Sequence, residues 1–293
     1  MRLRPRMTPP VRVLTYNVSW EATTGTAAGS ARGYGKKCAA SANARGKNNC
    51  YRNVLHTCSR VPYDFIGLQE SNLVLQTDVV EKLNRLGQGS YELISRQMGI
   101  TTPCIIYNTS RFSKLGQAMF AFVKRSNGTN ARGRPAVGQL FLFRGGKEPV
   151  AFINMHAPHD RYGLRDNITQ LLKALQTQTS SPISRVIVTG DYNKEHLNSF
   201  VVPASLRRRL PFQPLINTSN RIPTAWDLQG TRGTAAYTAA VDNVLLAGGV
   251  FQYGPETWHS KARMLLPKDR SFRFSTNTSD HSPVASILRF FRK

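Results

Sequence analysis

The stretch RVIVTGDYN, residues 185–193, joins an apolar run to a short polar segment and sets the expectation for the fold. The run Arg185–Thr189 is rich in β-branched residues, which is typical of a buried strand, and Gly190 follows it as a turn signal. Asp191 and Asn193 come directly afterwards. Ligand sites in layered α/β proteins gather where strands end, so this stretch predicts both a sheet and a polar site at its edge.

Similar apolar runs, most of them bounded by Gly, Pro or Asn, recur along the rest of the chain and predict further strands. They are Val11–Tyr16, Asp64–Gln69, Cys104–Tyr107, Val137–Phe143, Val150–Met155, Val241–Ala247 and Val284–Leu288. Apolar residues three or four apart predict helices over Asn72–Leu86 and Arg165–Gln176. Strands alternating with a few helices favour an α/β or α+β fold with a sheet core.

The domain organisation follows from what the sequence lacks, since no linker and no internal repeat separates the predicted strands into two sets. One domain over residues 11–290 is therefore expected, after a basic tail at residues 1–10. Glu21–Asn53 is rich in Gly, Ala, Ser, Lys and Asn without periodicity, which predicts a long basic surface loop inserted at about residues 21–53. Arg125–Arg134 has the same character between two strands.

The charge is strongly one-sided, with 40 Lys and Arg against 16 Asp and Glu and a formal net charge of +24. Such a surface attracts polyanions by releasing their counterions, so nucleic acid is the first expected partner and an acidic membrane face the second. Candidate contacts to backbone phosphates are Lys36, Lys37, Arg207 and Arg208, although such runs also occur as solvated faces or targeting signals.

Apolar segments and cysteines bear on the compartment. No apolar run is long enough to cross a membrane and no signal-peptide core follows the amino terminus, so we expect an intracellular protein without a membrane span. Cys38, Cys50, Cys58 and Cys104 are too sparse for a disulfide scaffold, which predicts reduced thiols. Zinc held by three of them with His56 is disfavoured, because their spacing matches no tight ligand pattern.

Acidic residues are scarce, and several stand at predicted strand ends together with amide and imidazole side chains. Asp or His alone at such a place is usually a turn, cap or structural residue. As a set, they offer the oxygen ligands that hard cations prefer. The set is Asn17, Glu70, His156, Asp191, Asn193, Asp242, Asp280 and His281.

Six segments in a fixed order resemble the motif series of the endonuclease/exonuclease/phosphatase superfamily, the deoxyribonuclease I-like proteins. They are Tyr16-Asn17, Leu68-Gln69-Glu70, His156-Ala157-Pro158, Gly190-Asp191-Tyr192-Asn193, Val241–Leu246 and Ser279–Pro283. The resemblance covers about residues 11–290. It implies a four-layered α/β sandwich, in which two mostly antiparallel sheets pack face to face with helices outside. It also implies hydrolysis of phosphodiesters or phosphomonoesters with magnesium or manganese, calcium being a less expected ion and zinc a disfavoured one.

The resemblance also implies a role for each matching residue. Glu70 would hold the metal, with Asn17 and Asp280 at the same pole, and the metal would neutralise charge that develops on the phosphate. Asp242 would orient His281, and either His281 or Asp191 would activate water. Asn193 would donate to a phosphate oxygen in the transition state.

His156 matches a histidine that works near the leaving group in the deoxyribonuclease I branch, where a glutamate pairs with it. The matching strand here, Gly99–Cys104, has no carboxylate, so His156 is expected to be unpaired or paired differently. Arg134 matches a phosphate-contacting arginine, and its guanidinium suits bidentate contact with phosphate. A solvated loop arginine is the alternative at this position.

Departures from the motifs narrow the substrate. No Trp precedes Gly190 in the inositol 5-phosphatase pattern, which disfavours inositides, whereas the charge favours a nuclease with little sequence specificity, on DNA rather than RNA. Abasic-site and 5′-phosphotyrosyl repair enzymes remain alternatives, and Arg165 and Gln170 resemble the helix of the latter. Ser19-Trp20-Glu21 resembles members from large DNA viruses. A non-catalytic nucleic-acid packaging protein is the alternative from another class.

Overall fold

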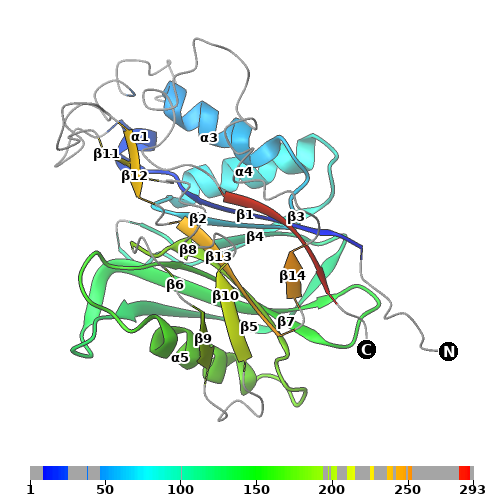
Figure 1. The fold of residues 1–293 in the computed structure, drawn as a ribbon. Coiled ribbons are helices and arrows are strands. Elements are labelled where there is room, and N and C mark those ends of the chain that lie inside the picture. Colours follow the sequence, from blue (N-terminus) through cyan, green and yellow to red (C-terminus); the bar gives the residue numbers. More distant parts are fainter. Residues whose placement is uncertain are drawn as a thin grey trace.

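The computed structural model describes most of the chain, and all structural statements below concern these residues. They are 9–25, 38, 47–99, 101–193, 197, 199–202, 210–214, 225–227, 236–239, 242–248, 250–252 and 284–290. Within them the chain forms two large sheets that pack face to face, with helices on both outer surfaces (Figure 1).

The first sheet has six strands in the order β14-β15-β1-β2-β4-β3. Neighbouring strands pair antiparallel except for β1 and β2, which run parallel with Asn17 opposite Gln69. This parallel pair brings the carboxyl ends of two strands to one edge. The strands are β1 (Val11–Asn17), β2 (Phe65–Gln69), β3 (Tyr91–Ser95), β4 (Cys104–Asn108), β14 (Val250–Gln252) and β15 (Val284–Phe290).

The second sheet has seven strands in the order β5-β6-β7-β8-β13-β10-β9. Its one parallel pair among the described strands is β7 with β8, which places His156 opposite Asp191. The strands are β5 (Phe112–Lys124), β6 (Asn130–Phe143), β7 (Pro149–His156), β8 (Arg185–Asp191), β9 (Phe200–Val202), β10 (Leu210–Pro214) and β13 (Asp242–Ala247). A separate ribbon pairs β11 (Ala225–Asp227) with β12 (Ala236–Ala239).

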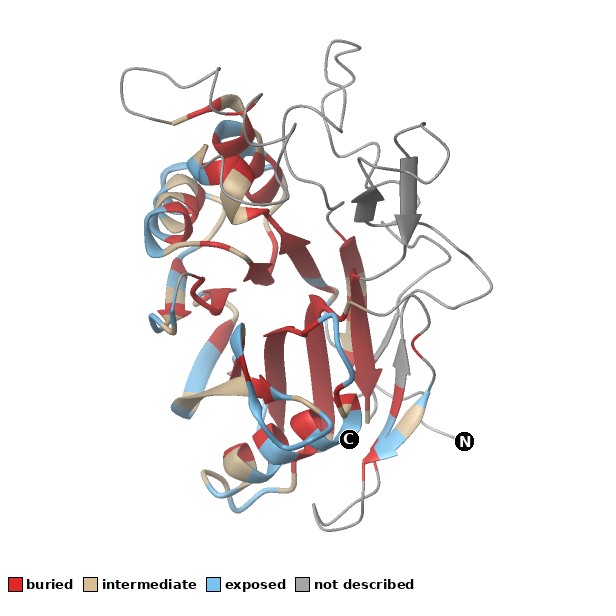
Figure 2. Ribbon diagram, turned by 90° about the vertical axis from the view of Figure 1, so that its left-hand side faces the viewer, coloured by how far each residue is buried: buried red, intermediate tan, exposed pale blue. Residues whose placement is uncertain are grey.

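Helices complete the sandwich, giving four layers. The longer ones are α3 (Asn49–Ser59) and α4 (Leu73–Arg85) on the first sheet and α5 (Leu164–Gln176) on the second, while α1 (Trp20–Thr24) follows β1 (Figure 1). One hydrophobic cluster fills each of the three spaces between layers. The central one is aromatic, with Phe65 stacked on Phe152, and Figure 2 shows the central strands buried. The expected sandwich of two mostly antiparallel sheets is therefore confirmed.

All eight predicted strands and both predicted helices occur, with ends that shift by a few residues except at β6. β6 begins at Asn130 rather than near Val137, so the segment Arg125–Arg134 is a short turn followed by strand. The sequence pattern missed β3 and β5 because polar side chains interrupt both strands. β5 lies at the sheet edge and is only partly buried, so it lacks a clean apolar alternation.

The predicted long loop over Glu21–Asn53 is wrong at both of its ends, which form α1 and the start of α3. Asn48 caps α3 by accepting a hydrogen bond from the Tyr51 amide at 2.8 Å, as N-cap asparagines commonly do. The buried face of α3 then repeats at Tyr51, Val54 and Cys58. Residues 26–37 and 39–46 lie outside the described part of the chain.

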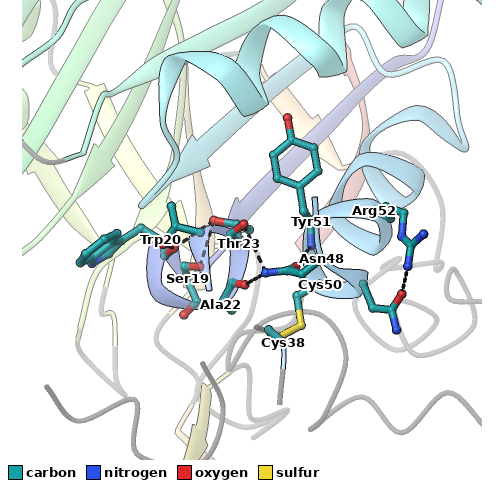
Figure 3. Close-up of a disulfide and its surroundings, with 11 residues drawn as sticks. Ser19, Trp20, Ala22, Thr23, Cys38, Asn48, Cys50, Tyr51 and Arg52 are labelled. Atoms are coloured by element: carbon teal, nitrogen blue, oxygen red, sulfur yellow. Dashed lines mark hydrogen bonds between the residues drawn. A yellow bond between two sulfur atoms is a disulfide. The ribbon is translucent and has the colours of Figure 1, made fainter. Parts of the chain in front are cut away.

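The prediction of reduced thiols is wrong for one pair, because Cys38 and Cys50 form a disulfide (Figure 3). The zinc alternative fails with it, since two of its three thiols are joined. Cys58 and Cys104 are free and buried, and burial raises the pKa of Cys104 to about 12. Disulfides persist chiefly in oxidising compartments, so the expectation of an intracellular protein loses support from the cysteines. Among the described helices, none is long and apolar enough to span a bilayer.

Gly190 sits where β7 and β8 approach closely, and its replacement gives a first testable prediction. A Cβ at Gly190 would lie 2.3 Å from the backbone carbonyl oxygen of Met155, which cannot move without distorting the parallel pair. We expect Gly190→Ala to lower the free energy of unfolding by about 1–3 kcal/mol, measured by urea denaturation.

Gly138→Ala is the matched control for this prediction. Its Cβ would meet the Leu175 and Ile153 side chains at 3.2 and 3.4 Å, and these side chains are able to shift. The control should therefore lose less stability than Gly190→Ala. Equal losses, or no loss at Gly190, would contradict the close approach of the two strands.

Candidate active site at the common edge of the two sheets

Two parallel strand pairs, one in each sheet, bring the predicted polar residues to a common edge. Asn17 and Glu70 come from the ends of β1 and β2, while His156 and Asp191 come from the ends of β7 and β8. Asn17 joins the two sheets, because its amide Nδ2 donates to Asp191 Oδ2 at 2.9 Å and to Glu70 Oε1 at 3.3 Å. The site therefore depends on the packing of one sheet on the other.

His156 and Arg134 complete a compact cluster of charged and polar groups. His156 Nε2 lies 3.5 Å from Glu70 Oε1 and 3.4 Å from Asp191 Oδ2. Arg134 Nη1 contacts the His156 ring and lies 3.8 Å from Glu70 Oε1. Asn17, His156 and Asp191 are all at most 3% exposed. Burial strengthens electrostatic interactions, so these groups act on one another and on any ligand that reaches them.

The expectation for the partner of His156 is met in an unexpected way. No carboxylate comes from the strand that supplies one in the deoxyribonuclease I branch, and the nearby carboxylates are instead Glu70 and Asp191. Because Arg134 Nη1 also contacts the ring, the His156 imidazole lies against two carboxylates and one guanidinium.

The backbone is held in the left-handed region at two site positions, Glu70 with φ 54° and Asn193 with φ 47°. Such angles are uncommon outside glycine and are found at functional sites, where the surrounding structure compensates their cost. Asn193 is fixed on both sides: its amide nitrogen donates to Asp191 Oδ1 at 2.9 Å and its side chain donates to the Ala157 carbonyl at 2.7 Å.

A buried polar network lies behind the strand ends and spans both sheets. Asn154 on β7 donates to the carbonyls of Leu68 and Cys104 at 2.9 and 2.8 Å, and accepts from Gln69 and Thr189. Gly67 leaves the space for this crossing, since a Cβ there would lie 2.4 Å from Thr189 Oγ1. Satisfied buried networks of this kind specify one arrangement of the elements they join. Here the network fixes the register of the strands that carry the site.

Two tyrosines hold the turn that follows Asp191. The Tyr162 hydroxyl donates to the Tyr192 carbonyl, and the Tyr192 hydroxyl donates to the Val188 carbonyl at 3.0 Å. Burial, together with the nearby Asp191 charge, raises the pKa of Tyr162 well above its usual range. Both hydroxyls therefore remain neutral donors, and the turn keeps its place beside the site.

A pocket of about 460 Å³ opens beside the cluster. Glu70, Arg134 and His156 form its catalytic side, and Trp20, Glu21, Gly99, Thr101, Arg132 and Gly133 form the rest. Sequence reasoning missed Thr101 and Arg132 altogether and noted Trp20 only as part of a resemblance. For two of these residues the sequence offers a signal, which is closeness to a predicted site residue. Trp20 stands three residues after Asn17, and Arg132 stands two residues before Arg134.

The other predicted residues fall into two groups. Asp242 is fully buried at the start of β13, directly opposite Asp191 in the antiparallel pair. Arg165 is exposed in the first turn of α5, with its Nε 3.6 Å from Asp166, and it does not line the pocket. The remainder lie outside the described residues: Lys36, Lys37, Arg207, Arg208, Asp280 and His281.

The donor set fits a hard divalent cation. Glu70 and Asp191 supply the carboxylates, and the Asn17 side-chain amide lies between them with its Nδ2 toward both. No group of three or more His, Cys, Asp or Glu side chains forms a ready metal site within the described ranges. Magnesium suits this pattern, because it commonly uses one or two carboxylates and completes its shell with water and substrate phosphate.

Comparison with known proteins gives one family match. The model of the Endonuclease/Exonuclease/phosphatase family matches residues 14–281, which include every site residue described above. Comparison with curated proteins finds no significant match.

Solved structures share the fold at low sequence identity. The Bacteroides thetaiotaomicron mannosyl-6-phosphatase is 18% identical with a TM-score of 0.59, covering 95% of this chain and 99% of its own. The human Nocturnin catalytic domain with bound sulfate is 15% identical with a TM-score of 0.56, covering 98% and 97%. D. rerio TDP2 complexed with a single-strand DNA product is 14% identical with a TM-score of 0.53, covering 96% and 99%.

Proposed function

The chain belongs to the Endonuclease/Exonuclease/phosphatase family, whose members hydrolyse phosphate esters, and from this premise we propose that it is a nuclease. The reaction is hydrolysis of backbone phosphodiesters with a divalent cation, on DNA in preference to RNA and with little sequence specificity. The observation that carries the proposal is the cluster of Asn17, Glu70, His156 and Asp191 across the two sheets.

The charge of the chain supports a polyanionic substrate over a small phosphate ester. A net charge of +24 adds affinity with each basic side chain that reaches a backbone phosphate. A sugar phosphate or an inositide contacts only a few of these side chains. The fold is also that of D. rerio TDP2, solved with a single-strand DNA product.

In the proposed mechanism, Glu70 would hold magnesium or manganese, with Asn17 and Asp280 as further candidate ligands. The cation supplies neutralisation of the charge that develops on the phosphate and the leaving oxygen. The side chains of the chain itself activate the water and hold the phosphate. Asp191 orients or deprotonates the attacking water, with Asp242 and His281 as the alternative pair for that step.

The remaining groups act on the phosphate and the leaving group. Asn193 donates to a phosphate oxygen, and Arg134 holds another through its guanidinium. His156, which lies against Glu70, Asp191 and Arg134, would donate a proton to the leaving oxygen.

A substrate panel tests this proposal. Purified protein is incubated with supercoiled DNA, single-stranded DNA, RNA, abasic duplex, 5′-phosphotyrosyl DNA, mannose 6-phosphate and a phosphoinositide, each with magnesium and with EDTA. We expect magnesium-dependent cleavage of unmodified DNA with the highest kcat/KM. Preference for the abasic or phosphotyrosyl substrate would establish the repair alternative, and binding without turnover would establish the packaging alternative.

A further inference from the structure

One wall of the pocket beside the catalytic cluster has no part in the mechanism above. Trp20, Arg132 and the buried Thr101 line this part of the pocket. The Trp20 side chain is half-buried, and Figure 3 shows its indole pointing away from the disulfide and from Asn48. An aromatic ring is thus presented beside the site where a phosphate is to be cleaved.

The position of Trp20 is fixed by contacts on both sides of α1. A helix of five residues is too short to be stable alone. At its start, the Ser19 amide donates to Asn17 Oδ1 at 3.1 Å, which ties it to the catalytic cluster. At its far side, Asn48 Nδ2 donates to the Ala22 carbonyl at 2.7 Å.

The disulfide adds a third anchor to α1. Ala22 packs against Cys38 and Cys50 in a small buried cluster, so α1 is pressed against α3 (Figure 3). These contacts hold the helix, and with it the backbone of Trp20, before any ligand arrives. Such preorganisation lowers the entropic cost of recognition.

Arg132 supplies a cation to the same pocket. It is exposed on β6, two residues before Arg134, and Gly133 between them has φ 73° and bends the strand. Side chains two apart along a strand share a face, and both arginines line the pocket. The pocket thereby combines a phosphate-gripping arginine at the cluster with a second cation farther out.

An aromatic platform next to a cationic track is the arrangement by which proteins bind single-stranded nucleic acid. Bases of a continuous duplex are stacked on one another, so a free base face is offered only by single strands, ends and frayed sites. The pocket volume of about 460 Å³ is within the range of small-ligand sites and accepts a nucleotide.

We propose that Trp20 stacks on the nucleobase adjoining the scissile phosphate, while Arg132 contacts the next backbone phosphate. This inference rests on the proposed nuclease function and names its substrate class as single-stranded nucleic acid. Trp20 and Arg132 are thus assigned to substrate binding, and neither takes part in a bond-making step.

The test separates binding from catalysis by working in EDTA. Binding of a fluorescein-labelled oligothymidine is followed by anisotropy for the wild type, Trp20→Ala, Trp20→Phe and Arg132→Ala. Stacking on an aromatic ring contributes about 1–3 kcal/mol per base, so Trp20→Ala should raise Kd about 5- to 150-fold. Trp20→Phe keeps an aromatic face and should recover most of the affinity.

Arg132→Ala should reduce the slope of log Kd against log salt by about 0.7, the value for one phosphate contact on a single strand. Arg144→Ala is the matched control, because Arg144 is exposed just beyond the opposite end of β6. It should leave the slope unchanged. An equal change in both variants would assign the effect to the general charge of the protein.

The chain's three tryptophans allow a further readout. In a Trp226→Phe/Trp258→Phe variant, Trp20 is the only tryptophan, and oligothymidine in EDTA should quench its emission when tryptophan is excited selectively. Normal cleavage by Trp20→Ala, with unchanged Kd, would overturn the inference while leaving the nuclease intact. Trp20-dependent binding without turnover would uphold the stacking site and refute the nuclease. If Trp20→Ala lost affinity for mannose 6-phosphate and for oligothymidine to the same extent, Trp20 would have only a structural role.

Discussion

Asp191→Asn should lower the rate of DNA cleavage by about a hundred- to ten-thousandfold, the range for loss of a positioned acid or base. The carboxylate is 1% exposed and accepts hydrogen bonds from Asn17 Nδ2 and the Asn193 amide. An amide in its place removes the negative charge beside His156 and presents an NH₂ group to one of these donors. The site then lacks the group that orients or deprotonates water.

The measurement is kcat on a labelled oligonucleotide with magnesium, together with a thermal melt of each protein. Asp166→Asn is the matched control, because Asp166 is exposed in the first turn of α5 and does not line the pocket. The control should cleave at the wild-type rate. Near-normal cleavage by a folded Asp191→Asn protein would remove Asp191 from the mechanism.

Glu70→Gln should raise the magnesium concentration for half-maximal activity by at least about tenfold, because a neutral amide is a much weaker ligand for a hard cation than a carboxylate. Glu70 also lies 3.8 Å from the Arg134 guanidinium, so loss of its negative charge leaves this positive charge without a partner carboxylate and disfavours a bound cation further. Catalysis at subsaturating magnesium should fall in proportion.

A readout that does not need turnover accompanies this prediction. A ligand that binds the native state raises its melting temperature, so millimolar magnesium should stabilise the wild type and have little effect on Glu70→Gln. Glu81→Gln, on the exposed face of α4, is the control and should respond as the wild type does. A magnesium-induced shift of equal size in Glu70→Gln would place the cation elsewhere.

The architecture was predictable from sequence because buried strands carry strong local patterns. The runs around Val186–Val188 and Phe152–Ile153 are fully buried on both faces and are therefore apolar throughout. β5 carries no such pattern, since it lies at a sheet edge and its residues are mostly only partly buried. α1 is likewise invisible to periodicity, because its position depends on Asn48 and the disulfide rather than on its own five residues.

The candidate site was predictable where polar residues end apolar strands. Asn17, Glu70, His156 and Asp191 were chosen for that reason, and the two parallel pairs bring them within hydrogen-bonding or ion-pair distance. The contact of His156 with Glu70 could not be inferred, since Glu70 comes from the other sheet. Contacts between sheets depend on how the layers pack, which no local pattern encodes.

The disulfide shows a further limit of sequence reasoning. Cysteine count and spacing favoured reduced thiols, yet Cys38 and Cys50 are joined. A single bridge of this kind depends on the tertiary approach of two segments and leaves no framework in the spacing. The pocket lining also depends on tertiary structure, because Trp20 and Arg132 come together with Glu70, Arg134 and His156 only in the folded chain.

If the cluster that joins the two sheets cleaves nucleic acid, a single gel shows it directly. A 5′-labelled single-stranded DNA oligonucleotide is incubated with the wild type and with Asp191→Asn, purified identically, in magnesium and in EDTA. We expect shortened labelled products in one lane only, that of the wild type with magnesium. Intact substrate in that lane, or equal cleavage by Asp191→Asn, would contradict it.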